Sequence, residues 1–129
     1  MSFESNDLLT QIRTEALQCF KESLKPVNPY EAVNRFVRLE GNRLYIGKRE
    51  NGDTEINLED FERIFLVGGG KATAPMARAM EDILGKRITE GFINVKYGFT
   101  DKLAFTGIAE ADDPLPDKNG VEGTSTKDI

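Results

Sequence analysis

The chain has 129 residues, of which 30% are charged and 39% are hydrophobic, a balance typical of a folded protein and a length that suits one domain. Its 17 basic and 22 acidic residues give a net charge of −5, which argues against a nucleic-acid partner. The absence of histidine excludes Ser–His and Cys–His catalysis and most zinc sites.

Targeting and redox signals are few. No segment approaches the ~20 apolar residues of a membrane-spanning helix, and the start lacks a basic region followed by an apolar stretch, so we expect a cytoplasmic protein with no membrane partner. Cys19 is the single cysteine and lies within a helical pattern, which favours a small core residue over a nucleophile.

The first half of the chain predicts two helices and a hairpin. Apolar residues recur at helical spacing from a cap at Ser5 or Asn6 to about Leu24, which predicts a helix that covers the core. A second, short helix is expected to start near Pro29. Segments 36–40 and 43–47 flank the turn signal Gly41-Asn42 and predict a hairpin.

The second half predicts a strand–helix–strand unit. Another turn is expected at residues 51–53, after which residues 54–58 lead toward a short apolar segment, 63–67, typical of a strand buried inside a parallel sheet. A helix follows and ends at Gly85, with polar residues falling between its apolar ones. The apolar residues are Met76, Met80, Ile83 and Leu84, and the polar ones are Arg78, Glu81 and Asp82. Two later strands are expected within residues 92–97 and 104–111, joined by a turn at 98–102.

The junction between the buried strand and its helix carries the strongest chemical signal. Three glycines and Lys71 would stand at the carboxyl edge of the sheet, where open α/β folds bind ligands and a helix start can hold an anion. The Walker and dinucleotide patterns both fail, because Ala72 and Thr73 occupy positions where they require Ser or Thr and Gly. An anion site and a tight structural turn with a solvated lysine both remain open.

The end of the chain differs from the rest. Residues 112–117 are acidic and proline-rich, and residues 118–129 have no apolar face, so we expect an extended or mobile tail over residues 112–129. An α/β sheet with two or three parallel strands leaves an edge and a face exposed, which suggests part of a larger protein.

Several segments in this order resemble the amino-terminal part of the glycerate kinases that carry a MOFRL domain at their carboxyl end. The matching blocks are the first helix and residues 27–33, 66–72, 76–77, 95–98, 110–111 and 116–117. The resemblance implies a partial Rossmann-like α/β sheet with covering helices, over residues 1–129, as a truncated part of a larger two-domain fold.

The same resemblance implies an activity and a site. A glycerate kinase transfers the γ-phosphoryl group of ATP, with a divalent metal such as Mg²⁺, to a glycerate hydroxyl; this part alone is expected to be inactive. It would need the missing carboxyl-terminal part or a homo-oligomer. By resemblance Lys71 is the catalytic candidate, and the phosphate- or substrate-binding candidates are Gly68, Gly69, Gly70, Ala72 and Asp117.

One position departs from the family pattern. The family usually has histidine where this sequence has Asp113, which is either a metal ligand or part of a solvated acidic turn. Asp117 fits a turn cap and a site residue equally well.

Two alternative functions stay open beside the kinase. The chain could be a phosphosugar-binding module resembling sugar-phosphate isomerase domains, although these usually have Ser where this chain has Ala72. It could also be a non-catalytic truncated product.

Overall fold

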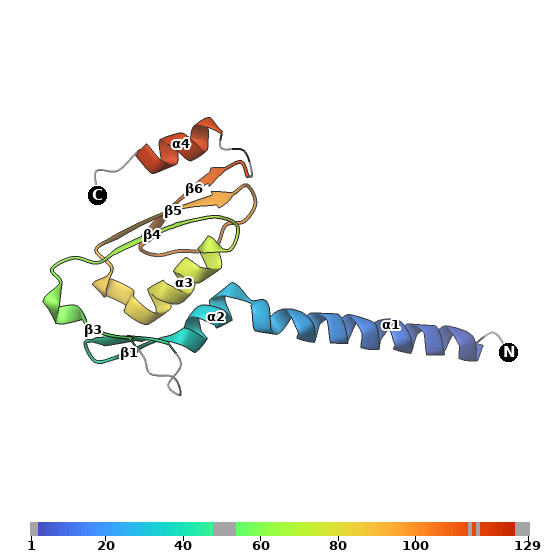
Figure 1. The fold of residues 1–129 in the computed structure, drawn as a ribbon. Helices are drawn as coiled ribbons and strands as arrows, with labels where there is room; N and C mark the ends of the chain where they lie inside the picture. Colours follow the sequence, from blue (N-terminus) through green and yellow to red (C-terminus); the bar gives the residue numbers. More distant parts are fainter. Residues whose placement is uncertain (1–2, 48–53, 114, 116, 126–129) are drawn as a thin grey trace.

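The computed structural model describes residues 3–47, 54–113, 115 and 117–125. A long helix, α1 (Phe3–Leu24), leads through a 3₁₀ turn, η1 (Lys25–Val27), into a body built of two small sheets (Figure 1). Mixed helices and a parallel sheet confirm the predicted α/β class.

The larger element of the body is a parallel sheet. Its order is β4 (Phe65–Gly69), β5 (Glu90–Lys96), β6 (Thr106–Ala111), and helix α3 (Thr73–Leu84) links β4 to β5. On one face, Ile93 and Val95 of β5 pack against Ala74 and Ala77 of α3, all four buried. The small alanine side chains let α3 lie close to the sheet, which confirms the predicted strand–helix–strand unit.

A second, antiparallel sheet packs beside α3. Helix α2 (Pro29–Phe36) leads into β1 (Val37–Glu40), β2 (Arg43–Ile46) and β3 (Thr54–Asn57). The Asn28 side chain accepts hydrogen bonds from the backbone N–H groups of Tyr30 and Glu31 and so caps α2. The predicted short helix and hairpin are thus confirmed, and the turn expected at residues 51–53 lies outside the described residues. Leu44 of β2 joins Leu84 and Ile88 in a second small core.

Helix α3 has the predicted extent but not the predicted faces. It ends at Leu84, and Gly85 follows with φ +55° and ψ −130°, a positive-φ conformation that glycine adopts readily but not the left-handed helical one expected of a glycine cap. Met76, assigned to the apolar face, is 44% exposed, whereas Glu81, assigned to the polar side, is 7% exposed. The reason is that the face toward the sheet is formed by the small residues Ala74 and Ala77, and Glu81 lies on the same side of the helix as these two.

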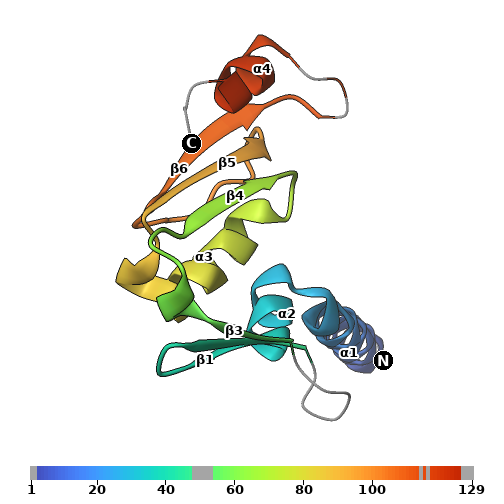
Figure 2. The same ribbon diagram turned by 60° about the vertical axis from the view of Figure 1, so that its left-hand side comes forward.

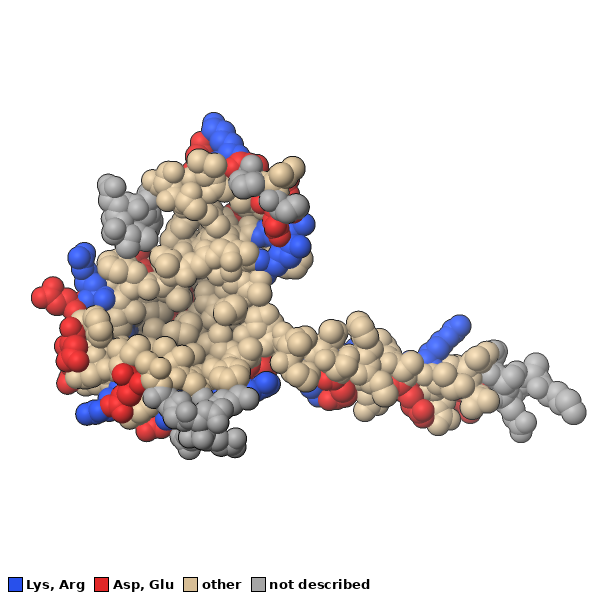
Figure 3. All heavy atoms as spheres, in the orientation of Figure 1, with Lys and Arg blue, Asp and Glu red and all other residues tan. Residues whose placement is uncertain are grey.

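Helix α1 contradicts the prediction of a covering helix. It begins at Phe3, before the expected cap at Ser5 or Asn6, and extends away from the body as an arm (Figures 1 and 3). Ile12 is 52% and Phe20 61% exposed, although both belong to its apolar face. Cys19 is exposed as well, so its assignment to the core is wrong.

Strand β4 and the tail also differ from expectation. In the described residues β4 pairs only with β5, so it is an edge strand, and Val67 is 65% exposed rather than buried. Residues Lys118–Ser125, expected to be extended or mobile, form helix α4. Figure 2 shows α4 beside β6, on the side of the sheet away from α3.

Two close contacts explain why α4 can form there. A Cβ atom added at Gly123 would collide with the Asn94 side chain of β5 and would lie 3.0 Å from the Ala109 Cβ atom of β6. The Asn94 amide in turn donates to the Gly120 carbonyl, at 3.4 Å. Glycine at position 123 therefore lets α4 lie close to the sheet. The weak helix propensity of glycine gives no sign of this helix in the sequence.

Within the described part of the chain, no helix combines the length and the apolar character needed to cross a bilayer.

Candidate functional site

The glycine loop connects the end of β4 with the start of α3 at the carboxyl edge of the sheet. Gly70 has a φ of +113°, a conformation that side-chain-bearing residues avoid, and its N–H donates to the Asn94 carbonyl at 2.9 Å. A Cβ atom at Gly68 would collide with the Thr73 side chain, whereas one at Gly69 would meet nothing within 4 Å. The backbone conformation of Gly70 and the close contact at Gly68 thus explain why glycine occupies these two positions. Gly69 leaves open space beside the loop.

The start of α3 is not capped by a side chain. Ala72 holds the N-cap position and contributes no side-chain hydrogen bond, while its carbonyl accepts from the Met76 N–H at 3.3 Å. Pro75 occupies the first turn, where the missing N–H costs no intrahelical bond. The helix start therefore keeps its partial positive charge near Lys71.

Lys71 lies opposite a carboxylate that comes from another part of the chain. Its Nζ atom is 3.4 Å from a carboxylate oxygen of Asp113, which follows β6, and the two side chains are 54% and 42% exposed. Lys96, at the end of β5, donates from its Nζ atom to the backbone carbonyl of Asp113 at 3.2 Å. We call Lys71, Lys96, Asp112 and Asp113 the carboxyl-edge cluster.

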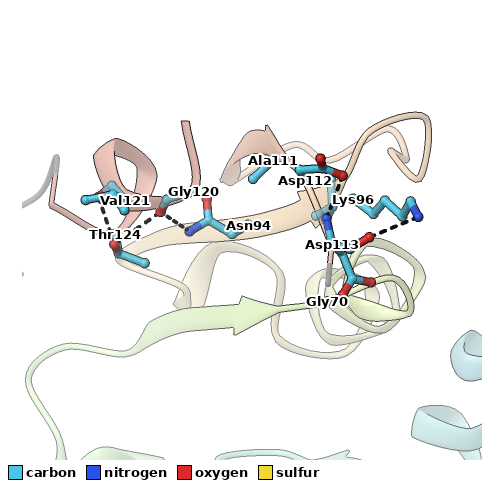
Figure 4. A pocket seen from close by; sticks show the side chains of 10 residues that line it. Gly70, Asn94, Lys96, Ala111, Asp112, Asp113, Gly120, Val121 and Thr124 are labelled. Atoms are coloured by element: carbon cyan, nitrogen blue, oxygen red, sulfur yellow. Dashed lines mark hydrogen bonds between the residues drawn. The ribbon is translucent and has the colours of Figure 1, made fainter. Parts of the chain in front are cut away.

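A pocket of about 440 Å³ opens at this cluster (Figure 4). Its floor comes from β5 and β6 and one wall from α4, while the glycine loop contributes Gly70. Lys96, Asp112 and Asp113 line it together with apolar atoms of Ala111 and Val121. Lys71 does not line the pocket, but Asp113, with which it forms an ion pair, does.

Asp117 has a structural role in the arrangement. One of its carboxylate oxygens accepts from the Gly120 N–H at 2.9 Å, and the other from the Tyr97 hydroxyl at 2.8 Å. Both bonds favour the ionised carboxylate and hold the pKa of Asp117 below its usual value, the Gly120 bond more strongly. The bond to Asp117 raises the pKa of Tyr97. Asp117 therefore caps the start of α4, and its assignment as a phosphate- or substrate-binding residue stays a prediction.

The two lysines of the cluster offer an anion site, although Asp112 and Asp113 balance their charge. Lys71 in the loop between β4 and α3 and Lys96 at the end of β5 approach one turn, and the uncapped start of α3 adds partial positive charge. Among the described residues, no group of three or more His, Cys, Asp or Glu side chains could hold a metal ion. The Asp113 carboxylate is already directed to Lys71, so its assignment as a metal ligand gains no support.

Sequence reasoning missed Lys96 and Asn94. Lys96 occurs in a block, residues 95–98, that carried the family resemblance, but no motif assigned it a role. The alternation of side chains along β5 was the available signal, because it places Asn94 and Lys96 on the face opposite the buried Ile93 and Val95.

Comparisons with known proteins find similarity to glycerate kinases over most of the chain. Glycerate 2-kinase from Pyrococcus horikoshii is 30% identical over 112 residues, which cover 87% of this chain and 23% of that protein. D-glycerate 2-kinase from Thermotoga maritima is 31% identical over 110 residues, 84% of this chain and 22% of that protein. A crystal structure of a protein from Pyrococcus horikoshii OT3 matches with a TM-score of 0.67 and 31% identity, over 88% of this chain and 24% of that one.

The chain therefore spans less than a quarter of the length of these relatives. A family model described as "Domain of unknown function (DUF4147)" matches residues 15–127. The chain belongs to the DUF4147 family.

Proposed function

We propose that this chain forms the amino-terminal α/β part of an ATP-dependent glycerate kinase, with Lys71 at the site of phosphoryl transfer. The observation that carries the proposal is the carboxyl-edge cluster, where Lys71 and Lys96 approach the same turn beside the pocket. The named relatives, both glycerate 2-kinases, support the substrate class.

The chemistry of phosphoryl transfer fits such a cluster. The reaction depends on positioning and on stabilising negative charge, and a lysine at a helix start supplies a full charge where the helix already supplies a partial one. In this proposal the Lys71 ammonium binds a phosphate or the glycerate carboxylate, and the loop Gly68, Gly69, Gly70 and Ala72 lets that group approach the backbone. Mg²⁺ would arrive bound to ATP, and we assign it no ligand in this chain.

The proposal further holds that this chain binds without catalysing. The cluster lies at the end of a three-stranded sheet and contains few groups that could act on a hydroxyl. We propose that the other catalytic groups come from a carboxyl-terminal part of a longer protein or from another copy of the chain.

The proposal is tested by NMR titration of the chain with D-glycerate, Mg-ATP, inorganic phosphate and glucose 6-phosphate. We expect glycerate or Mg-ATP to shift the amide signals of residues 68–72 and 94–96, and Lys71→Ala to abolish the shifts. The variant should change the free energy of unfolding by no more than about 0.5 kcal/mol, since the side chain is half exposed.

Lys86→Ala is the matched control. Lys86 is exposed in η4 (Gly85–Arg87), just before β5 and hence at the opposite edge of the sheet, so its loss should leave the titrations unchanged. Shifts with glucose 6-phosphate alone would instead favour a phosphosugar-binding module. Unchanged glycerate binding in Lys71→Ala would remove Lys71 from the site.

A further inference from the structure

The Lys71 ammonium already has an anionic partner within the chain. The Asp113 carboxylate lies 3.4 Å from it, and both side chains face solvent. An ion pair this exposed contributes little to stability, because water and salt screen it. The Asp113 carboxylate can nevertheless affect which ligands bind Lys71. Any anion that contacts the lysine also comes close to the negative charge of Asp113.

The Asp113 carboxylate is held in this position by its own backbone. Its carbonyl accepts from the Lys96 ammonium at 3.2 Å, and its N–H donates to the Asp112 side chain at 2.9 Å. Figure 4 shows this hydrogen bond between Lys96 of β5 and Asp113 beside the pocket. Both bonds act on the main chain, so they orient the turn while leaving the Asp113 carboxylate available as an acceptor.

We infer that Asp113 determines the specificity of the Lys71 site by selecting anions that carry a neighbouring hydroxyl. This inference rests on the proposed function. The carboxylate of a hydroxy acid can bind Lys71 while the hydroxyl of the same ligand donates a hydrogen bond to Asp113. The Asp113 carboxylate then exchanges its contact with Lys71 for a contact with the ligand. An anion without a hydroxyl must displace Asp113 from Lys71. The negative charge of Asp113 then has no partner and repels the bound anion. Sites that bind a substrate hydroxyl discriminate against analogues that lack it for the same reason.

The test compares two three-carbon acids and inorganic phosphate as NMR-titrated ligands. D-Glycerate carries hydroxyls, propionate carries none, and phosphate reports on bare anions. In the unmodified chain we expect glycerate to bind at least about threefold more tightly than propionate. Asp113→Asn removes the charge and should strengthen propionate and phosphate binding about three- to fivefold, the range of an exposed ion pair. Asp113→Ala also removes the acceptor, and should reduce the preference for glycerate to below about twofold.

Asp60→Asn is the control, because it removes the same charge from an exposed aspartate in η3 (Leu58–Asp60), away from the cluster. It should leave all three affinities unchanged. Unchanged propionate and phosphate affinities in both Asp113 variants, or an equal gain in Asp60→Asn, would overturn the inference.

The outcomes also separate this inference from the proposed function. Glycerate binding that depends on Lys71 but is indifferent to Asp113 would refute the inference and keep the function. Another outcome is tighter phosphate binding in Asp113→Asn without glycerate binding in any variant. It would show that the charge of Asp113 weakens anion binding, but it would refute both the selection of hydroxy acids and the glycerate site. Mg-ATP is titrated beside these ligands, and weaker Mg-ATP binding in Asp113→Asn would identify Asp113 as a metal ligand and overturn the inference.

Discussion

Helices α1 and α3 both carry apolar residues at helical spacing and have opposite surroundings. Helix α3 is packed on more than one side, with Ala74 and Ala79 fully inaccessible to solvent. In α1 the equivalent residues, such as Leu9 and Ile12, remain more than half exposed, and the helix stands clear of the body (Figure 3). Periodicity thus shows that a helix has an apolar face, but not what covers it.

The polar sides of the two helices differ as well. All three charged residues of α3 contact distant parts of the chain: Arg78 binds Asp101, Asp82 accepts from the Tyr30 hydroxyl, and Glu81 accepts from two backbone N–H groups. In α1, the Gln11–Glu15 and Thr14–Thr10 hydrogen bonds stay within the helix. Helix α3 therefore organises the body with both of its faces.

The largest effect expected from this comparison is at Glu81. Its carboxylate accepts from the N–H groups of Ala104 at 2.6 Å and Phe105 at 2.8 Å while only 7% exposed. Glu81→Ala should lower the free energy of unfolding by about 2–4 kcal/mol, because two partly buried donors lose a charged acceptor. Glu15→Ala, the same change in α1, should cost less than about 0.5 kcal/mol. Urea denaturation of both variants checks this, and equal losses would show that α1 is packed in solution.

A smaller difference in stability is expected when one alanine in each helix is replaced by leucine. Ala74 has no exposed surface, so Ala74→Leu should overpack the contact between α3 and the sheet and destabilise the chain by about 1–3 kcal/mol. Ala16 is exposed in α1, and Ala16→Leu should change stability by less than about 0.5 kcal/mol. Thermal unfolding of the pair measures the contrast. A strong destabilisation by Ala16→Leu would mean that another surface covers α1.

The smallest effect concerns α4, whose attachment to the sheet we expect to depend on pH. The pKa of Asp117 is lowered from 3.8, so its contribution is present above that value and is lost as pH falls through the lower, folded-state pKa. The pKa of Tyr97 is raised from 10.0, so its contribution is present below that value and is lost as pH rises through the higher, folded-state pKa. Amide shifts of residues 118–125 should therefore stay constant between these limits and change outside them.

Asp117→Asn provides the control for this pH dependence. The variant should remove the acid-side transition of α4. An acid transition that persists in Asp117→Asn would assign it to another carboxylate.

The sequence determined the local elements of this protein. Turn residues such as Gly41 and Gly85 act through their own backbone conformations, and periodicity acts over a few neighbouring residues, so the hairpin, the strand–helix–strand unit and the glycine loop were predictable. The family was recognisable for a similar reason, because each matching block is a short run of neighbouring residues and the blocks follow one another in a fixed order.

Only the tertiary structure decided what covers these elements and what meets at the candidate site. The exposure of Cys19, the burial of Glu81 and the docking of α4 through Gly123 all depend on segments far away in the sequence. The same holds for the contacts of Asp113 with Lys71 and Lys96, which bring the ends of three strands together. Such contacts arise from the order of strands in the sheet, and a one-dimensional pattern does not contain that order.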